Sequence, residues 1–420
     1  MVEAGMAGAV STLLLGPRVC LVGPCEATEL DGSTYEGGGG LIRYAIAYSS
    51  LLNKPLHIHS IRANRPGAQG LRVEHTAAIR TLSKLALATV EGNAAGSREL
   101  WFRPHSDPGR FLDGLSTKLD VTTEGAASIL LIALLPFMLF SHLASRRSQF
   151  SPKFTHDQTL EVVIRAGTLC VKAPSIFYLR QVLFPTFNLI GIGKENVHLL
   201  ERYEQGWHTQ GKKYPGKMPM SPPEVSSDFT NTLNDEITAL LSADDTRTSH
   251  IEVKIEVHDS TARDQYHLLL VAETLSPTSF LGYEEVYPQT GRFPHEIHGD
   301  QEKIAEYLIR GCIRGLWKEL QKGNAVDEHT EDVLVIYQSL ASGFSSVESN
   351  SNARQVPEFN PNSKALDEAG QIYDIDTSTL HRQTSWWIAK LMADVQQKHR
   401  VIDGHEMQGC VGIALGQKPE

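Results

Sequence analysis

The chain has 420 residues and a mass of 46.3 kDa, and its 41% hydrophobic and 21% charged residues are ordinary for a globular protein. A chain of this length buries enough apolar surface to fold without disulfide bonds, which excludes a small disulfide scaffold, a collagen-like rod and a wholly disordered chain. The net charge of −10 and the pI of about 5.9 argue against coating nucleic acid through bulk charge, yet they allow a local basic pocket.

The cysteines and the apolar segments indicate the kind of cellular compartment and argue against a membrane-spanning helix. The five cysteines are odd in number and form no CxxC pair, which favours a reducing compartment and gives no zinc signature. The longest apolar run, at 129–140, is too short to span a bilayer and contains Pro136, so we predict a buried helix and no membrane partner. An apolar patch near the N-terminus has no basic segment before it, so an export signal is not expected.

The first strong motif is a glycine run. Residues 31–40 read DGSTYEGGGG and precede an apolar helical pattern at Leu41, Ala45, Tyr48 and Leu52. The open backbone N–H groups and the positive dipole end of such a helix favour phosphate. Taken alone, the run fits a flexible turn better than a phosphate site.

A strand and an arginine-bearing loop follow. Residues 55–61 alternate as a strand does and lead into a loop with Arg62 and Arg65. Clustered arginines at a strand-to-helix turn suit forked contacts to phosphate, and a solvated loop with surface arginines is the alternative. Arg72, Glu74 and His75 are predicted to precede a helix whose apolar face carries Ile79, Leu82 and Leu85.

The middle of the chain continues to alternate between strands and helices. Residues 160–165 predict a strand, and Ser175 is the predicted N-cap of the next helix. Pro, Gly, Lys and Ser concentrate at 208–228, which we interpret as a linker. Alternating segments at 251–257 and 266–273 predict strands of a small inserted domain.

Long helices are predicted in the last third. Apolar residues four apart over 304–320 predict one helix, with Gly323 as its C-cap. A second helix is predicted to start at Thr330, and a polar loop follows at 343–370. His381 is then expected just before the N-terminus of a last helix.

Taken in chain order, these motifs resemble the RNA 3′-terminal phosphate cyclase family, from about Leu30 to Gly412. The segments that match the family's patterns are DGSTYEGGG, IRANRPGAQGLRVEH, VEGNAAGSRELWFRP, TTEGAASILL, RAGT with APS, AVDEHTEDVLVIYQSLASG and TLHRQT. Each match alone is weak, and their shared order makes the resemblance specific.

The resemblance implies an α/β (α+β) fold. In this family, repeated units of two helices on a four-stranded sheet form a large domain, with a smaller α/β domain inserted between the later units. On that basis we predict four parts, namely an N-terminal extension at 1–28, the first part of the large domain at 29–218, the inserted domain at 219–302 and the last part, with the histidine motif, at 303–420.

The resemblance also implies three nucleotidyl-transfer steps. A histidine attacks the α-phosphate of ATP, becomes adenylylated and releases pyrophosphate. The AMP passes to a 3′-phosphate at an RNA end, and the neighbouring 2′-hydroxyl expels it to leave a 2′,3′-cyclic phosphate. Mg²⁺ or Mn²⁺ is the expected metal. A largely neutral imidazole is a usable nucleophile near pH 7, and the required 2′-hydroxyl makes RNA the substrate.

The family motifs assign the expected site residues. His381 is the expected nucleophile. The residues expected to bind the nucleotide or the RNA end are Glu36, Arg43, Arg62, Arg65, His75, Pro174, His329 and Asp332. We expect the three arginines to bind phosphates, and Glu36 to place the metal or a hydroxyl. For Asp332, a helix first-turn charge worth under about 1 kcal/mol is an equal alternative.

Four positions depart from the family's glutamines: Gly40, Glu74, Ile132 and Val333. The side chains of Ile132 and Val333 cannot hydrogen-bond, and each lost contact costs about 1 to 2 kcal/mol of nucleotide binding. Glu74 adds negative charge near the phosphates.

These departures leave a second hypothesis open. The protein would be a non-catalytic cyclase-like factor in ribosome assembly, with pre-ribosomal particles as partners. That branch of the family lacks the histidine motif, whereas TLHRQT is intact here. Nucleoplasm or nucleolus is the expected compartment, with cytoplasm as the alternative. A carboxyvinyl transferase built from similar repeats is a third alternative, by fold analogy alone.

Overall fold

The computed structural model describes residues 26–65, 67–105, 118–145, 161–170, 172–192, 231, 235, 266–275, 278–287, 297, 300–347, 380–402 and 404–415. The predicted linker at 208–228, the predicted strand at 251–257 and most of the polar loop at 343–370 lie outside these residues. The division into domains therefore stays a prediction.

The N-terminal part forms a four-stranded sheet. Its strands are β1 (Thr28–Asp31), β2 (Leu56–His59), β3 (Thr89–Glu91) and β4 (Leu100–Arg103), in the order β1-β2-β4-β3. The β1–β2 pair is parallel and the other two pairs are antiparallel. Alternate residues on one face are fully buried, among them Leu56, Ile58 and Phe102. β2 confirms the strand predicted within 55–61.

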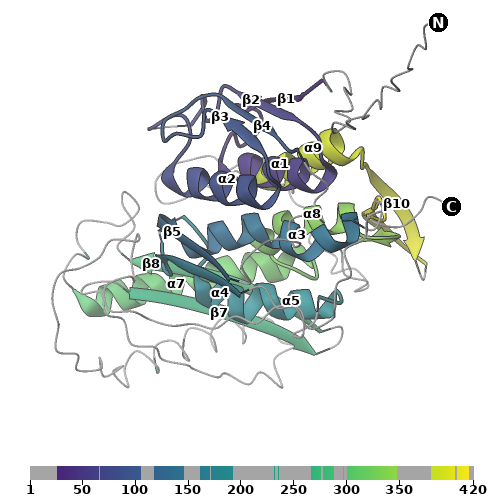
Figure 1. Cartoon of the computed structure of the whole chain (residues 1–420). Helices are drawn as coiled ribbons and strands as arrows, with labels where there is room; N and C mark the ends of the chain where they lie inside the picture. The colour runs from purple at the N-terminus through teal and green to yellow at the C-terminus, as the bar shows by residue number, and fades with distance from the viewer. Residues whose placement is uncertain are drawn as a thin grey trace, which may run out of the picture.

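Two helices cover this buried face (Figure 1), α1 (Gly39–Leu52) and α2 (Val73–Leu85). Both predicted helices are confirmed, but α2 begins at Val73 and so includes Glu74 and His75, which the prediction placed before it. α1 begins inside the glycine run, two residues before the first apolar position of its pattern, because Gly38 serves as its N-cap. The sheet and these helices form one two-helix, four-strand unit, and the repetition of that unit stays a prediction.

In the next segment, two strands pair with each other and a long helix connects them along the chain. β5 (Lys118–Ala126) and β6 (Glu161–Gly167) are parallel. Between them, α3 (Ala127–Ser145) holds the apolar run with Pro136, and Leu130, Leu134 and Phe137 are fully buried. The predicted buried helix is thus confirmed, and no helix among the described residues is long and apolar enough to cross a bilayer.

A helix with a π turn follows. α4 (Ile176–Tyr178) continues into the π-helix η2 (Leu179–Leu183) and then into α5 (Phe184–Leu189). Ser175 is the N-cap as predicted, and its hydroxyl accepts a hydrogen bond of 3.0 Å from the Tyr178 backbone N–H.

A hairpin packs on the longest helix of the described residues. β7 (Tyr266–Leu275) and β8 (Thr278–Tyr287) are antiparallel and lie against α7 (Gln301–Lys322). The strand predicted at 266–273 and the helix predicted over 304–320 are both present. Gly323 ends α7 in the left-handed conformation, with φ of 70°, as the predicted C-cap requires.

The last elements differ from prediction at their starts. α8 (Glu328–Leu340) begins before Thr330, because the carboxylate of Asp327 caps it by accepting from the Thr330 N–H. α9 (Leu380–Ala393) begins before His381, so that histidine lies in the first helical turn and not ahead of the helix. A three-stranded sheet follows, with β10 (Gln397–Ile402), β11 (His405–Val411) and β9 (Phe344–Ser345) in that order.

Segments from opposite ends of the chain share one core. α9 lies beside α1 and α8, with α3 in the adjacent layer (Figure 1). Ile388 and Met392 of α9 are fully buried in the cluster that also holds Leu41 and Ile336. The chain is therefore a mixed α/β protein, as predicted, in which the start of α9 is brought against the glycine run before α1.

Candidate active site

The N-terminus of α1 lies against charged side chains because glycines occupy it. A Cβ on Gly38 would overlap the Glu36 carboxylate, and one on Gly39 would lie 2.5 Å from Nε2 of His75. No side chain caps this helix, so its first N–H groups keep their capacity to bind an anion. The glycine run thus forms the helix N-terminus expected of a phosphate site.

His381 projects from the first turn of α9 toward two carboxylates. Its Nδ1 lies 3.1 Å from Oε2 of Glu36 and 4.0 Å from Oδ2 of Asp332. The His381 side chain is 46% exposed, whereas those of Glu36 and Asp332 are 5% and 12% exposed. The imidazole is therefore accessible to a substrate, while the buried carboxylates of Glu36 and Asp332 lie next to its Nδ1 atom.

Glu36 connects this histidine to the arginine loop. Its other oxygen, Oε1, forms an ion pair with Nη2 of Arg65. Burial by itself would raise the pKa of the Glu36 carboxyl, but the hydrogen-bonding interaction with His381 and the charges of His381, Arg65 and Arg43 outweigh it, so the pKa lies below its usual 4.5. Glu36 is consequently ionised at neutral pH.

The pKa of His381 shifts in the opposite direction. The interaction with Glu36 has the largest effect and, with the negative charges of Glu36 and Asp332, raises the pKa of the imidazole above 6.5 against burial and Arg43. Burial raises the pKa of Asp332 to about 6, which His381, His329 and Arg43 partly oppose. His381 therefore keeps its proton to a higher pH than an ordinary imidazole does.

His75 is held neutral beside the arginines. Burial, followed by the charges of Arg43, Arg62 and Arg72, lowers the pKa of its imidazole to about 3. Its Nδ1 accepts a 3.1 Å hydrogen bond from the backbone N–H of Arg72, which fixes its ring at the start of α2. The His75 side chain therefore lines the site as a fixed and uncharged group.

The predicted arginines gather around the glycine run. Arg43 lies 3.0 Å from the position that a Cβ of Gly39 would take, and Arg65 binds Glu36. Arg62 is buried and has a left-handed backbone, with φ of 58°. Burial and the charges of Arg72 and Arg65 lower the pKa of its guanidinium, which shows positive charge crowded into a small volume. Such a cluster is a local anion site on an acidic protein.

His329 and Pro174 are less directly placed. His329 lies on α8, lowers the pKa of the nearby Asp332 and meets the Tyr178 ring edge-on at 6.0 Å. Pro174 precedes Ser175, whose backbone N–H and hydroxyl bind Glu284. Among the described interactions, none joins Pro174 directly to the histidine and its carboxylates.

The four departures from the family pattern fall into two groups. Ile132 and Val333 are buried in the apolar core. Glu74 packs against Gly125 and places its charge near Arg62, and Gly40 leaves space beside Oε2 of Glu36. The carboxylate of Glu74 therefore faces the arginine cluster that is expected to bind phosphates.

Sequence reasoning missed the role of Thr384. Its hydroxyl accepts a 3.3 Å hydrogen bond from the buried backbone N–H of Glu36, and it donates to the Leu380 carbonyl. Thr384 is three residues after His381 and so lies on a neighbouring face of the same helix. The three-residue spacing within TLHRQT was the available signal.

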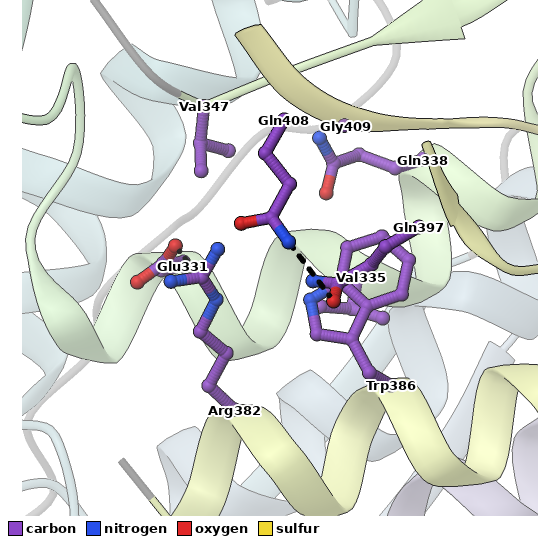
Figure 2. Close-up of a pocket in the computed structure, with 9 residues that line it drawn as sticks. All are labelled: Glu331, Val335, Gln338, Val347, Arg382, Trp386, Gln397, Gln408 and Gly409. Atoms are coloured by element: carbon purple, nitrogen blue, oxygen red, sulfur yellow. Dashed lines mark hydrogen bonds and ion pairs between the residues drawn. The ribbon is translucent and has the colours of Figure 1, made fainter. Parts of the chain in front are cut away.

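Besides the contact of Thr384 with Glu36, an ion pair joins α9 to α8. Figure 2 shows Arg382 facing Glu331, with the Arg382 Nε 3.1 Å from the Glu331 Oε1. These residues line a pocket with Trp386, Gln397 and Gln408, among others. No predicted site residue lines it, so we place the candidate site at His381.

The donor set fits a hard divalent cation. Glu36 and Asp332 both offer carboxylate oxygens near Nδ1 of His381. Mg²⁺ is commonly held by one or two carboxylates together with substrate phosphates. Within the described ranges no group of three or more His, Cys, Asp or Glu could hold a metal. The residues present therefore suit a cation that arrives with a phosphate.

The fold and the site define a mixed α/β protein with an accessible histidine beside a helix N-terminus and an arginine cluster. The sequence profile of the family described as RNA 3′-terminal phosphate cyclase matches residues 34–398. The chain belongs to this family, as the motifs predicted.

Archaeal relatives carry the same name. An RNA 3′-terminal phosphate cyclase of Korarchaeum cryptofilum is 28% identical over 350 residues, which cover 77% of this chain and 87% of that protein. One of Sulfolobus acidocaldarius is 28% identical over 335 residues, 75% of this chain and 88% of its own. One of Pyrococcus furiosus is 39% identical over 173 residues, 41% and 44% of the two chains.

Proposed function

We propose that this protein is an ATP-dependent RNA 3′-phosphate cyclase that works through an adenylylated His381. One observation carries the proposal. An accessible imidazole is held by buried carboxylates at a glycine-bounded helix N-terminus, beside an arginine cluster. The family membership and the names of the relatives support the same activity.

The Glu36 carboxylate, 3.1 Å from Nδ1, sets the tautomer of the nucleophile. Carboxylates only accept hydrogen bonds, so the proton of a neutral His381 resides on Nδ1, which faces Glu36 and Asp332. The lone pair is then on Nε2, which is the atom that attacks the α-phosphate of ATP. The raised pKa means that this neutral form increases as the pH rises above 6.5.

Positive groups stabilise the charge that develops during the attack. The pyrophosphate leaving group and the nonbridging oxygens both become more negative, and preorganised donors lower the free energy of that state. Arg43, Arg62 and Arg65, together with the open N–H groups of α1, supply those donors. When bound by Glu36 and Asp332, Mg²⁺ would add Lewis-acid polarisation of the phosphate.

The same site suits transfer of AMP to an RNA end. A 3′-phosphate carries negative charge and fits the arginine cluster by charge complementarity. His381 would then be the leaving group, and protonation of its imidazole is favoured by the Glu36 carboxylate. The neighbouring 2′-hydroxyl closes the ring and releases AMP.

Labelling with ATP that is radioactive at the α-phosphate tests the first step. We expect an acid-labile, alkali-stable label on the wild type with Mg²⁺. We also expect it on His399→Ala, which changes an exposed histidine of β10, and expect none on His381→Ala. A wild type without label, or a labelled His381→Ala, would contradict the proposal.

An RNA with a 3′-phosphate should then yield a cyclic end, and one with a terminal 2′-deoxyribose should not.

A further inference from the structure

An exposed aromatic side chain stands next to the residue that holds His381. Tyr35 is 49% exposed, although it is the immediate neighbour of the buried Glu36. Its backbone is left-handed, with φ of 49°, which is costly for a residue that has a large side chain. Strained residues that persist are concentrated at sites of function.

The turn that bears Tyr35 is fixed on both sides. The Thr34 N–H donates to the Asp31 carbonyl at 3.1 Å, and the Gly37 N–H donates to the Thr34 carbonyl at 2.9 Å. The Glu36 N–H is held by Thr384 of α9. The Tyr35 ring contacts the Trp387 ring in an edge-to-face pair, at 6.0 Å and 70°. The backbone on both sides of Tyr35 is thus held in place, and the ring itself contacts Trp387, which lowers the entropy that it would lose on binding.

Trp101, an aromatic residue of the outer sheet face, gives a contrast. The His57 ring stacks on Trp101 at 3.7 Å, and the Arg103 guanidinium lies 4.4 Å from the centre of the Trp101 ring. Trp101 therefore already has stacking partners within the chain. The single ring partner described for Tyr35 meets it edge-to-face, which leaves half of its surface open.

The surroundings of Tyr35 select a nucleic acid as its ligand. Glu36, the residue after Tyr35, pairs with Arg65 and lies 3.1 Å from His381, so the turn that bears Tyr35 borders the residues proposed to hold the 3′-phosphate. Unpaired RNA bases are bound by stacking on aromatic side chains. An RNA chain must also enter from solvent, and Tyr35 is on the exposed side of this loop.

We propose that Tyr35, supported by Trp387, stacks on the base of the RNA nucleotide that carries the 3′-phosphate. The proposal rests on the proposed function and adds a subsite for the RNA end to it. Stacking uses the π face that every base has, so this subsite tolerates any terminal base.

Fluorescence of a short RNA tests the subsite. The probe ends in a 3′-phosphate and carries 2-aminopurine as its terminal base, whose emission falls when it stacks. The variants are Tyr35→Phe, which keeps the ring, and Tyr35→Asn, which removes it and suits a left-handed backbone. We expect quenching by the wild type and Tyr35→Phe, and none by Tyr35→Asn. The KM for RNA should rise about 10-fold in Tyr35→Asn.

Histidine adenylylation with ATP alone separates this proposal from the proposed function. It needs no RNA, so we expect it to be unchanged in Tyr35→Asn. Wild-type protein that takes no AMP would refute the proposed function, whatever the fluorescence shows. Quenching retained in Tyr35→Asn, quenching only with 2-aminopurine one nucleotide upstream, or a raised KM for ATP instead of RNA would overturn the subsite.

Discussion

Thr384 joins two segments of the site through one hydroxyl group. It accepts from the Glu36 backbone and donates within its own helix, to Leu380. Glu36 in turn contacts His381 through its side chain. The position of the nucleophile therefore depends on a residue that makes no contact with it among the described interactions.

We predict that Thr384→Val lowers activity about 10-fold and moves the acidic limb of the pH–rate profile to lower pH. Valine has the same shape but leaves the Glu36 N–H unpaired, at a cost of about 1 to 3 kcal/mol. A loosened Glu36 raises the pKa of His381 less. Kinetics from pH 5 to 9 measure this shift.

Thr384→Ser should restore both the activity and the pH profile, because serine keeps the hydroxyl. Thr186→Val is the matched control, since Thr186 is buried and makes the same helical bond, to the Val182 carbonyl. A pH profile in Thr384→Val identical to that of the wild type would refute the positioning role.

His75 makes stability depend on pH in a predictable direction. Its pKa is about 3 in the folded protein and near 6.5 when unfolded, so the unfolded chain binds the extra proton between these values. Stability is therefore lost as the pH falls below 6.5. We predict that the wild type loses about 2 kcal/mol relative to His75→Gln between pH 6.5 and 5.

Glutamine stays neutral and can still accept from the Arg72 N–H. Urea unfolding of both proteins at several pH values measures the difference in the free energy of unfolding. A difference that does not change with pH would show that His75 is protonated equally in both states.

At the scale of elements, the start of α8 is fixed by one buried carboxylate. Asp327 accepts from the Thr330 N–H at 2.9 Å, from the Gly282 N–H of β8 at 2.7 Å and from the Tyr178 hydroxyl. It is 1% exposed. This cap therefore joins α8, which carries Asp332, to β8 and α4.

We predict that Asp327→Ala destabilises the fold by about 3 kcal/mol, because it removes an N-cap and leaves buried donors unpaired. Asp300→Ala is the matched control. Asp300 caps α7 by accepting from the Lys303 N–H at 3.2 Å in a more exposed place, so its loss should destabilise the fold less than the loss of Asp327. Urea denaturation measures both, and equal losses would contradict the role of the buried network.

At the scale of the whole molecule, the site exists only where the two ends of the chain meet. α9 buries Ile388 and Met392 against elements that begin more than three hundred residues earlier. The Lys54 ammonium adds a 2.7 Å hydrogen bond to the Met392 carbonyl. The N-terminal sheet unit and its helices thus have an apolar face that α9 covers.

We predict that a chain ending at residue 379 loses cooperative unfolding, because removal of α9 exposes the buried faces of α1 and α8. Thermal unfolding and binding of an apolar dye measure this. A chain ending at residue 415 is the control and should unfold like the full chain. A sharp transition in the shorter chain would show that α9 is dispensable for folding.

Local patterns determined much of the fold in advance. The apolar period of 304–320, the Gly323 cap, the Ser175 cap and the alternation at 55–61 all act over a few residues, so each could be predicted from its neighbours. Helix starts were less certain. α8 and α9 both begin earlier than predicted. For α8 the reason is that capping depends on which side chain reaches the free N–H groups, here that of Asp327.

The sequence by itself determined the family, through ordered motifs, and the residue types that the chemistry requires. Only the tertiary structure decided that Glu36 faces Nδ1 of His381, that Thr384 holds Glu36 and that Tyr35 is left open to solvent. The physical reason is separation along the chain. These contacts join residues more than three hundred positions apart, and no local propensity or periodicity specifies such a pair until the shared core brings α9 against α1.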